Sequence, residues 1–387
     1  MPTRLHPWLN NYVQSLSATP EPFTLARHAM ATRFEIVLHG ANPVALRAAG
    51  EEALGEIERI ESLLSLYRNT SEIAHVNARA AREAVRVSPP VFRLLEQARR
   101  LSEQTGGAFD ITIAPLVRCW GFMGATGRLP SPEAVVAARE KVGWHLVELD
   151  STNFAIRFAR DGVMLDLGAI GKGYAIERAA EILRDAGVTS AILHGGTSTV
   201  HAIGHPPDGD AWKIAIERPV EDFTTPPPLL ATVPLKDESL SVSAIWGRSF
   251  QSGDKTYGHV IDPRTAQPVE AALLSVVVLA SATETDALST ALLTLGTPGL
   301  QQIASLRVGT RCLVVSRRPN NSKSNPPASS IFIDSRTSRR TQFMASTKPR
   351  MSYETKFRRT PNPSRRWPTP LENQTWPEGS SRSPASG

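Results

Sequence analysis

The chain has 387 residues, of which 41% are hydrophobic, and it carries a formal net charge of +6. This apolar content suffices for one large folded core or two smaller ones, and no apolar run approaches the ~18 residues of a membrane-spanning helix, so we expect no transmembrane segment. The two cysteines, Cys119 and Cys312, stand in no metal or redox spacing, which argues against a disulfide scaffold and a cysteine zinc site.

The positive charge lies in the C-terminal part of the sequence. Residues 319–387 carry a net charge of +8, and the residues before them carry −2. Because this segment is rich in Pro, Ser, Asn and Arg and poor in aliphatic side chains, we predict that residues 319–387 form a disordered basic tail. A basic arm can contact nucleic acid or anionic lipid, but the favoured interpretation is a solvated extension with no specific nucleic-acid partner.

The N-terminal sequence MPTRLHPWLN begins no export signal, because no charged region is followed by an apolar stretch and a small-residue cleavage site. We therefore expect a cytoplasmic location. We predict three parts: a lead segment at residues 1–28, a folded domain at residues 29–318, and the basic tail.

The first half of the domain shows strand and helix patterns. We predict a strand at residues 32–38 and a long helix at residues 43–66 with Asn42 as its cap. A second helix is expected at residues 89–102, with Ser88 as its cap. The apolar face of the long helix consists of Leu46, Ala49, Ala53, Ile57, Ile60 and Leu64.

Further along the chain, hairpins and helices alternate. A third helix is expected after Ser131, and the dipeptide Asp161-Gly162 predicts a two-residue turn between two strands. A helix follows within GKGYAIERAAEILRDAG and ends at Gly187; a last helix is expected at residues 283–295. Strands fit TSAILHGG, WKIAIE and LLSVVVLA. This order predicts an α+β fold with mixed, largely antiparallel sheets packed against helices.

The stretch DLGAIGKGYAIERAAEIL raises the question of a phosphate site. It is no P-loop, because GxxxxGK[ST] is absent, and a lysine at a helix start is as often a solvated cap as a phosphate ligand. Asp166 is more informative, since a carboxylate between Leu165 and Leu167 needs a hydrogen-bonding role or a ligand.

Three other stretches have two interpretations each. GGAFDITIAPLVRCWGF suits a wall around a flat aromatic ligand or a helix end followed by core. His259, before the turn at Asp262-Pro263, is a catalytic or a structural histidine. Asp286 and Thr290 are four residues apart on one helix face, which offers hard oxygen ligands for Mg²⁺ or an ordinary solvated face.

Taken in order, six stretches make the chain resemble the FAD:protein FMN transferase family, also called the ApbE or thiamine-biosynthesis lipoprotein family. The resemblance covers about residues 29–315. The stretches are AMATRFEI, LSLYRNTSEIAHVN, GGAFDITIAPLVRCWGF, LDLGAIGKGYAIERAAEIL, HVIDPRTAQPV and TDALSTALLTLG.

The resemblance implies an α+β domain that binds FAD as substrate with Mg²⁺ at the pyrophosphate, and that transfers FMN to a Thr or Ser hydroxyl of an acceptor protein, releasing AMP. It implies that His259 is the catalytic base, with Asp286 orienting its imidazole as well as holding metal. The implied FAD contacts are Met30, Tyr67, Ala108, Phe109, Asp110, Asp166, Lys172 and Ile261. The implied metal ligands are Ala169 and Ser289 through backbone oxygen, and the side chains of Asp286 and Thr290.

The chain departs from the family pattern at two places. Thr197 stands where the family has an aspartate after two glycines, and LSVSAIWGRSF replaces a Ser-Gly-Asp segment, with Ser243 as its counterpart. The family is often exported and lipid-anchored, whereas this sequence shows neither signal. Two alternatives to transfer remain open: Mg²⁺-dependent hydrolysis of FAD to FMN and AMP, and FAD binding without turnover.

Overall fold

The structure is a computed structural model that describes residues 21–124, 127–218, 229–245 and 247–316, and the backbone of two further strands at 329–334 and 339–343. All of these belong to one compact unit, which ends at Ser346. The first strand begins at Phe23, so the sheet starts before the predicted domain boundary at residue 29. The remainder of the predicted tail and of the lead segment lies outside the described residues.

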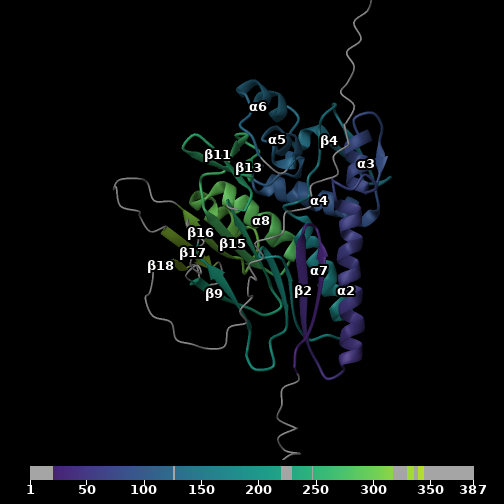
Figure 1. Cartoon of the computed structure of the whole chain (residues 1–387), viewed down its shortest axis with the longest axis vertical. Coiled ribbons are helices and arrows are strands. Elements are labelled where there is room, and N and C mark those ends of the chain that lie inside the picture. The colour runs from purple at the N-terminus through teal and green to yellow at the C-terminus, as the bar shows by residue number, and fades with distance from the viewer. Residues whose placement is uncertain are drawn as a thin grey trace, which may run out of the picture. The chain divides into compact units, whose positions relative to one another are not determined.

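A nine-stranded sheet forms the centre of the unit, and every described strand pair in it is antiparallel (Figure 1). This confirms the predicted fold class. In sheet order the strands are β1 (Phe23–Ala29), β2 (Thr32–His39), β6 (Ser190–Gly195), β7 (Thr199–Ile203), β10 (Ser239–Ala244), β15 (Leu274–Leu279), β16 (Arg311–Ser316), β17 (Ser329–Asp334) and β18 (Arg339–Phe343).

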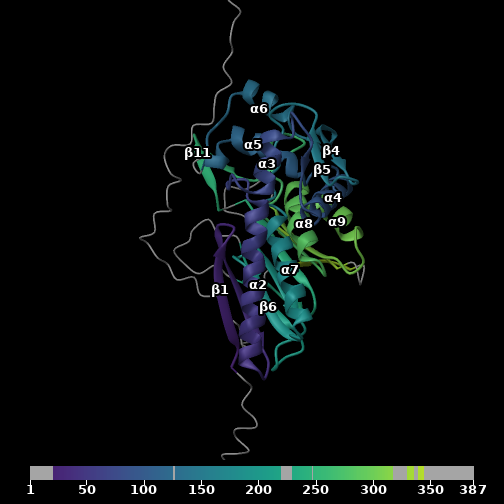
Figure 2. The same cartoon turned by 90° about the vertical axis from the view of Figure 1, so that its right-hand side faces the viewer.

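Helices cover one face of this sheet. Helix α7 (Gly171–Asp185) packs on β6 and β7, and α8 (Ala282–Leu295) packs on β7, β10 and β15. Helix α2 (Pro43–Leu64) lies between β1 and α7, as Figure 2 shows. Helix α4 (Pro89–Gln104) contacts α8. Their apolar faces and the inward side chains of the strands form the main hydrophobic core.

The other face of the sheet is covered by a separate hairpin of β8 (Trp212–Glu217) and β9 (Leu229–Leu235). Alternation along β15 shows how the two cores are divided: Leu274 and Val276 point to the hairpin, whereas Val277 points to the helices. Such a strand, apolar on both faces, is buried on both sides. The sheet therefore supports α7 and α8 on one face and is covered by the hairpin on the other.

Smaller elements build the upper part of Figure 1. The elements are α3 (Glu72–Arg79), β3 (Val85–Arg86), η1 (Ile111–Ile113), α5 (Ala114–Cys119), η2 (Phe122–Gly124), α6 (Pro132–Arg139), η3 (Trp144–Leu146), β4 (Val147–Asp150), β5 (Ala155–Phe158), β11 (Ser249–Ser252), β12 (Lys255–Gly258), β13 (Ile261–Asp262) and β14 (Gln267–Pro268). A third apolar cluster, which includes Trp120, Phe122 and Ile261, joins those around α5, α6 and the β11–β12 hairpin, whereas α3, β4 and β5 pack on the main core. Two others, η4 (Thr297–Gly299) and α9 (Leu300–Ser305), precede β16.

Several local predictions are confirmed. Asn42 caps α2, because its Oδ1 accepts hydrogen bonds from the backbone N–H groups of Val44 and Ala45, and the predicted apolar face of α2 is buried. Helix α7 ends at the predicted glycine: Gly187 has φ +80°, and Val188 N donates to Leu183 O.

Two local predictions are wrong. The turn at Asp161-Gly162 joins no hairpin: β5 pairs with β4 and β3 instead, and residues 163–167 form no strand. Ser88 does not cap α4, because its backbone N–H and its hydroxyl both donate to the Glu72 carboxylate at 2.7 and 3.1 Å.

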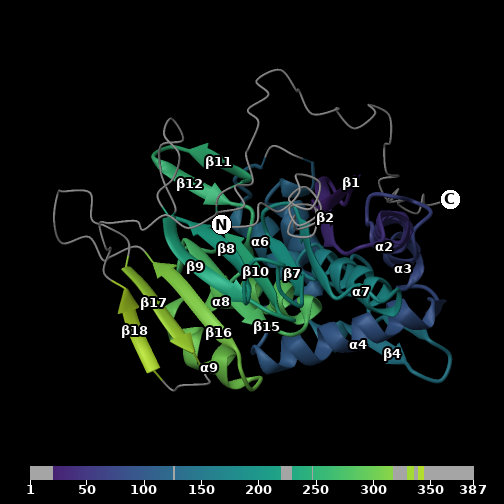
Figure 3. The same cartoon turned by 90° about the horizontal axis from the view of Figure 1, so that it is seen from below.

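Two strands lie within the segment predicted to be disordered. Strand β17 pairs with β16 and β18 pairs with β17, side by side at one edge of the sheet in Figure 3. Without β17, the outer backbone groups of β16 lack ladder partners, so an added strand satisfies them whatever its composition. Within the described residues, no helix is long and apolar enough to cross a membrane.

Candidate active site

The start of α7 is built by a short loop that carries Asp166. The Asp166 backbone N–H donates to Ile111 O at 2.7 Å, and its Oδ1 accepts from Gly168 N at 2.8 Å. Helix α7 begins without a side-chain cap, and Lys172 in its first turn donates from Nζ to Gly168 O at 3.2 Å. An uncapped helix start with an adjacent ammonium group is suited to bind an anion.

Opposing effects act on the pKa of the Asp166 carboxyl group. Burial raises its pKa, while the hydrogen bond from Gly168 and the positive charges of Lys172 and Arg248 lower it. Two cations from different parts of the chain, Lys172 and Arg248, therefore act electrostatically on one carboxyl group.

Helices α7 and α8 touch at Gly173 and Asp286. A Cβ on Gly173 would lie 2.2 Å from Ala282 O and 2.7 Å from Asp286 Cβ, so only glycine fits. The Gly173 N–H donates to Asp286 Oδ2 at 3.0 Å, and the Thr199 hydroxyl donates to Asp286 Oδ1 at 3.3 Å. The close approach thus puts a buried carboxylate at the first turn of α7.

Hydroxyl groups continue from Asp286 along α8. Thr290 Oγ1 and Ser289 Oγ donate to Asp286 O at 3.3 and 3.0 Å, and Ser243 Oγ lies 3.2 and 2.8 Å from the same two hydroxyl oxygens. Ser275 Oγ donates to Ser289 O at 2.6 Å. Ser243, the counterpart of the replaced family segment, is therefore part of this cluster.

This donor set fits Mg²⁺. It offers one carboxylate together with hydroxyl and backbone oxygens, and the described residues hold no cluster of three or more His, Cys, Asp or Glu side chains that would suit a softer ion. Mg²⁺ in proteins is held by one or two carboxylates plus substrate phosphates and water. Ala169, whose backbone oxygen is an implied ligand, lies two residues before the first residue of α7.

His259 follows the hairpin of β11 and β12. Both its backbone N–H and its ring Nδ1 lie on one carbonyl oxygen, that of Arg248, at 3.0 and 3.1 Å. A carbonyl oxygen only accepts, so Nδ1 carries the proton and Nε2 keeps its lone pair. The imidazole is therefore oriented as a base at Nε2.

This geometry corrects one expectation. Asp286 does not orient His259 in this structure, because the imidazole Nδ1 is held by Arg248 O, whereas the Asp286 carboxylate accepts from Gly173 and Thr199. The role of orienting group belongs to a backbone carbonyl, which a sequence pattern does not reveal.

The surroundings of His259 favour the neutral imidazole. Burial lowers its pKa from 6.5, and the positive charges of Arg248 and Lys172 lower it further, against the raising effect of its hydrogen bond to Arg248 O. Phe122 lies edge-on to the ring, with centroids 6.4 Å apart, and Phe250 and Tyr257 stack behind it. The aromatic stretch GGAFDITIAPLVRCWGF thus supplies a wall beside His259.

Arg248 is a site residue that the sequence analysis missed. It belongs to the replaced segment LSVSAIWGRSF and directly precedes β11. Its place in this segment was the only feature of the sequence that could have pointed to it. Its side chain contacts the Tyr67 hydroxyl and acts electrostatically on Asp166 and His259. The pKa of Tyr67 is raised, first by burial and then by Asp166, while Arg248 lowers it.

Comparison with known proteins agrees with this geometry. The ApbE family matches residues 30–314 of the sequence. The chain belongs to the ApbE family.

Relatives and solved structures support the assignment. The chain is 32% identical to a protein of Klebsiella pneumoniae (strain 342) named FAD:protein FMN transferase, over 64% of this chain and 77% of that protein. It is similar to the crystal structure of the ApbE protein from Thermotoga maritima, with a TM-score of 0.69 and 27% identity over 76% of this chain and 94% of that one. The apo form of the Pseudomonas stutzeri flavinyl transferase ApbE has a TM-score of 0.66 and 29% identity, over 77% and 92% of the two chains.

The remaining positions expected to contact FAD differ in exposure. The Tyr67 ring is 65% exposed and Met30 lies in the left-handed turn between β1 and β2, with φ +48°. Ala108, Phe109 and Ile261 bury their side chains in the hydrophobic clusters, so only their backbone atoms remain for a ligand.

Asp110 has a structural role of its own. Its Oδ1 accepts hydrogen bonds from the backbone N–H and the hydroxyl of Thr112 at 2.8 and 2.7 Å, which caps η1. Burial raises the pKa of Asp110, while Thr112 and then His145 lower it. Thr197, the other departure from the family pattern, is exposed in the turn between β6 and β7.

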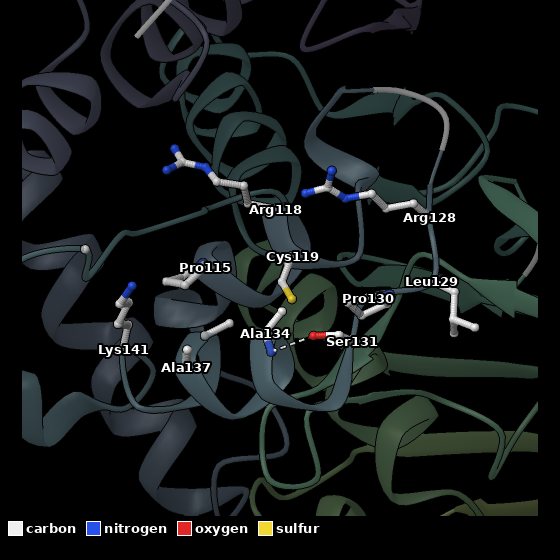
Figure 4. A pocket seen from close by; sticks show the side chains of 12 residues that line it. Pro115, Arg118, Cys119, Arg128, Leu129, Pro130, Ser131, Ala134, Ala137 and Lys141 are labelled. Atoms are coloured by element: carbon white, nitrogen blue, oxygen red, sulfur yellow. Dashed lines mark hydrogen bonds between the residues drawn. The ribbon is translucent and has the colours of Figure 1, made fainter. Parts of the chain in front are cut away.

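A cavity of about 550 Å³ lies apart from these residues, between α5 and α6 (Figure 4). Arg118, Arg128 and Lys141 surround it, and none of the predicted site residues lines it. The catalytic candidates instead lie where α7 contacts α8, at Gly173 and Asp286, and directly after the β11–β12 hairpin, at His259.

Proposed function

We propose that this chain transfers FMN from FAD to a Ser or Thr hydroxyl of an acceptor protein and releases AMP, with Mg²⁺ bound at Asp286. One observation carries the proposal: His259 presents an unprotonated Nε2 in the same electrostatic environment as Lys172, at the uncapped start of α7. A base and a cation that acts on the same ring support phosphoryl transfer, which requires a base beside an anion site. Relatives over most of the chain are named FAD:protein FMN transferase.

The reaction moves one proton and exchanges one phosphorus–oxygen bond. Nε2 of His259 accepts the proton of the acceptor hydroxyl as its oxygen bonds to the phosphorus on the FMN side. The bond from that phosphorus to the bridging oxygen breaks, and the electron pair leaves with AMP. The lowered pKa of His259 keeps the base unprotonated at neutral pH, so no proton need be lost before the attack.

The other residues bind and orient the substrate. The ammonium group of Lys172 offsets the charge that develops on the pyrophosphate oxygens. Asp286, Thr290 and the backbone oxygens of Ala169 and Ser289 would hold Mg²⁺, which when bound would neutralise phosphate charge and polarise the phosphorus. The exposed ring of Tyr67 offers a flat surface for the flavin.

The proposal is tested with the full chain, FAD, Mg²⁺ and candidate acceptor proteins with exposed Ser or Thr loops. A denaturing gel viewed under ultraviolet light shows covalent flavin, and AMP is assayed in parallel. A fluorescent acceptor band with equal AMP, lost in His259→Asn, is expected. AMP without a labelled acceptor means hydrolysis of FAD. FAD binding with neither product means a binding protein without turnover, and either result overturns the proposal.

A further inference from the structure

We propose that Arg248 is a second phosphate-binding cation of this site and contacts the FAD pyrophosphate opposite Lys172. The proposal rests on the proposed function, because it names a further residue for the same substrate. It assigns to Arg248 both an orienting role, through its carbonyl, and a binding role, through its guanidinium group.

The β11–β12 hairpin fixes where Arg248 lies. Its register pairs Ser249 with Gly258, so the next pair outward is Arg248 with His259. The two hydrogen bonds from His259 to Arg248 O hold that outer pair together. The side chain of Arg248 therefore starts from a backbone position that the catalytic histidine itself fixes.

The guanidinium group has no carboxylate partner within the part of the chain that the structure describes. Of thirteen ion pairs found there, none includes Arg248 or Lys172. Arg248 instead contacts the Tyr67 hydroxyl, and both cations act on Asp166 and His259. Arg264, by contrast, is paired with Asp262 at 2.8 Å.

Lys172 and Arg248 both act electrostatically on Asp166 and on His259. A pyrophosphate carries two negative charges and presents several oxygens, which a planar guanidinium group binds with two parallel N–H donors. Lys172 approaches from α7 and Arg248 from the hairpin, so the two come from elements far apart in the sequence. A diphosphate between them satisfies both.

A purely structural role for Arg248 makes a different prediction. If its side chain serves only to hold Tyr67, its loss affects the flavin end of the substrate and leaves the ADP portion unaffected. If it binds pyrophosphate, its loss weakens FAD and ADP alike. The two ligands therefore separate the two roles.

The test measures equilibrium binding of FAD by flavin fluorescence and of ADP by displacement of FAD, in chelator without metal. Variants are Arg248→Gln and Arg248→Lys, with Arg118→Gln as the matched control, since Arg118 is an exposed arginine away from the site. Charge-assisted hydrogen bonds contribute about 1.5–3 kcal/mol, so Arg248→Gln is expected to weaken both ligands about 10- to 100-fold. Arg248→Lys should recover part of the lost affinity, because it keeps the positive charge. The control Arg118→Gln should bind both ligands with wild-type affinity.

Three outcomes decide the matter. Equal weakening of FAD and ADP, with a shallower salt dependence of binding, supports the proposal. Weakening of FAD binding alone assigns Arg248 to Tyr67 and overturns the proposal. Wild-type affinity for both ligands, in a variant with wild-type Tm, overturns the proposal as well. Failure of the proposed function is seen separately, as absence of FMN transfer by the wild-type chain that still binds FAD.

Discussion

The carbonyl oxygen of Arg248 accepts two hydrogen bonds from His259, one from the backbone N–H at 3.0 Å and one from ring Nδ1 at 3.1 Å. This pair fixes the tautomer and the direction of Nε2 at once. An enzyme that depends on one neutral imidazole needs such a fixed tautomer, because rotation of the ring exchanges acceptor for donor.

The first prediction concerns His259 itself. His259→Asn keeps a side-chain donor for Arg248 O but removes the base, so FMN transfer should fall by about 10²- to 10⁴-fold, the usual effect of a general base. FAD affinity, measured by flavin fluorescence, should stay within about twofold. Transfer at the wild-type rate in this variant would show that another group takes the proton.

The second prediction concerns pH. Since His259 must be neutral, kcat/KM for FAD should stay level as pH falls to 6.5 and decline only below it, because burial, Arg248 and Lys172 lower the pKa of His259. These are the charged groups that act on the ring; Phe122 faces it from η2. Arg248→Gln and Lys172→Gln should each move the acid limb to higher pH, and a limb that moves down contradicts the assignment.

The third prediction concerns metal. Asp286→Asn retains the shape of the side chain but loses the negative charge, so Mg²⁺ should raise the Tm of wild-type protein with FAD and leave that of the variant unchanged. Asp286→Ala should further destabilise the fold by about 1–3 kcal/mol, because the buried Gly173 N–H loses its acceptor. Equal Tm shifts with Mg²⁺ in wild type and Asp286→Asn would place the metal elsewhere.

The fourth prediction concerns the contact of α7 with α8. Gly173→Ala pushes a methyl group to within 2.2 Å of the Ala282 carbonyl, so it should lower the free energy of unfolding by several kcal/mol and weaken FAD binding. The matched control is Gly171→Ala, two residues earlier, where the added Cβ meets only Leu64 and Leu167 at 3.8 and 4.0 Å. It should be neutral or slightly stabilising in chemical denaturation.

The fifth prediction concerns acid stability. Burial, and then the charge of Arg184, lower the pKa of His201 to about 3; Arg184 donates to its Nε2 at 2.8 Å and its Nδ1 lies 2.7 Å from Ser239 Oγ. Between pH 6.5 and 3 the unfolded chain binds a proton there and the folded chain does not, so stability falls on acidification by up to about 1.4 kcal/mol per pH unit. His201→Gln should flatten this slope, whereas the exposed His75→Gln should leave it unchanged.

Local structure was predictable wherever neighbouring residues alone decide it. The cap at Asn42, the apolar face of α2 and the glycine end of α7 depend on residues within one or two turns, and all are found. The close approach at Gly173 was not predictable in this way, because it admits α8, whose Asp286 lies 113 residues further along the chain.

What failed depends on partners distant in sequence. The Asp161-Gly162 dipeptide is a sound turn signal, but residues 163–167 find their partners in Asn77, which bonds both N and O of Leu165, and in Ile111. Arg248 and His259 are eleven residues apart and meet through a hairpin register that no periodicity reveals. Ser88 failed for the same reason: its N–H and its hydroxyl donate to Glu72, sixteen residues earlier, so the hydroxyl does not cap α4.

The hairpin that carries Arg248 and precedes His259 is a small element. In the part of the chain that the structure describes, β11 and β12 pair only with each other, over four residue pairs, and they are anchored by the rings of Phe250 and Tyr257. A two-stranded hairpin is marginal on its own, so its opening free energy lies far below that of the nine-stranded sheet. Amide hydrogen exchange in residues 249–258 should therefore be faster than in the nine-stranded sheet, at temperatures where the core stays folded.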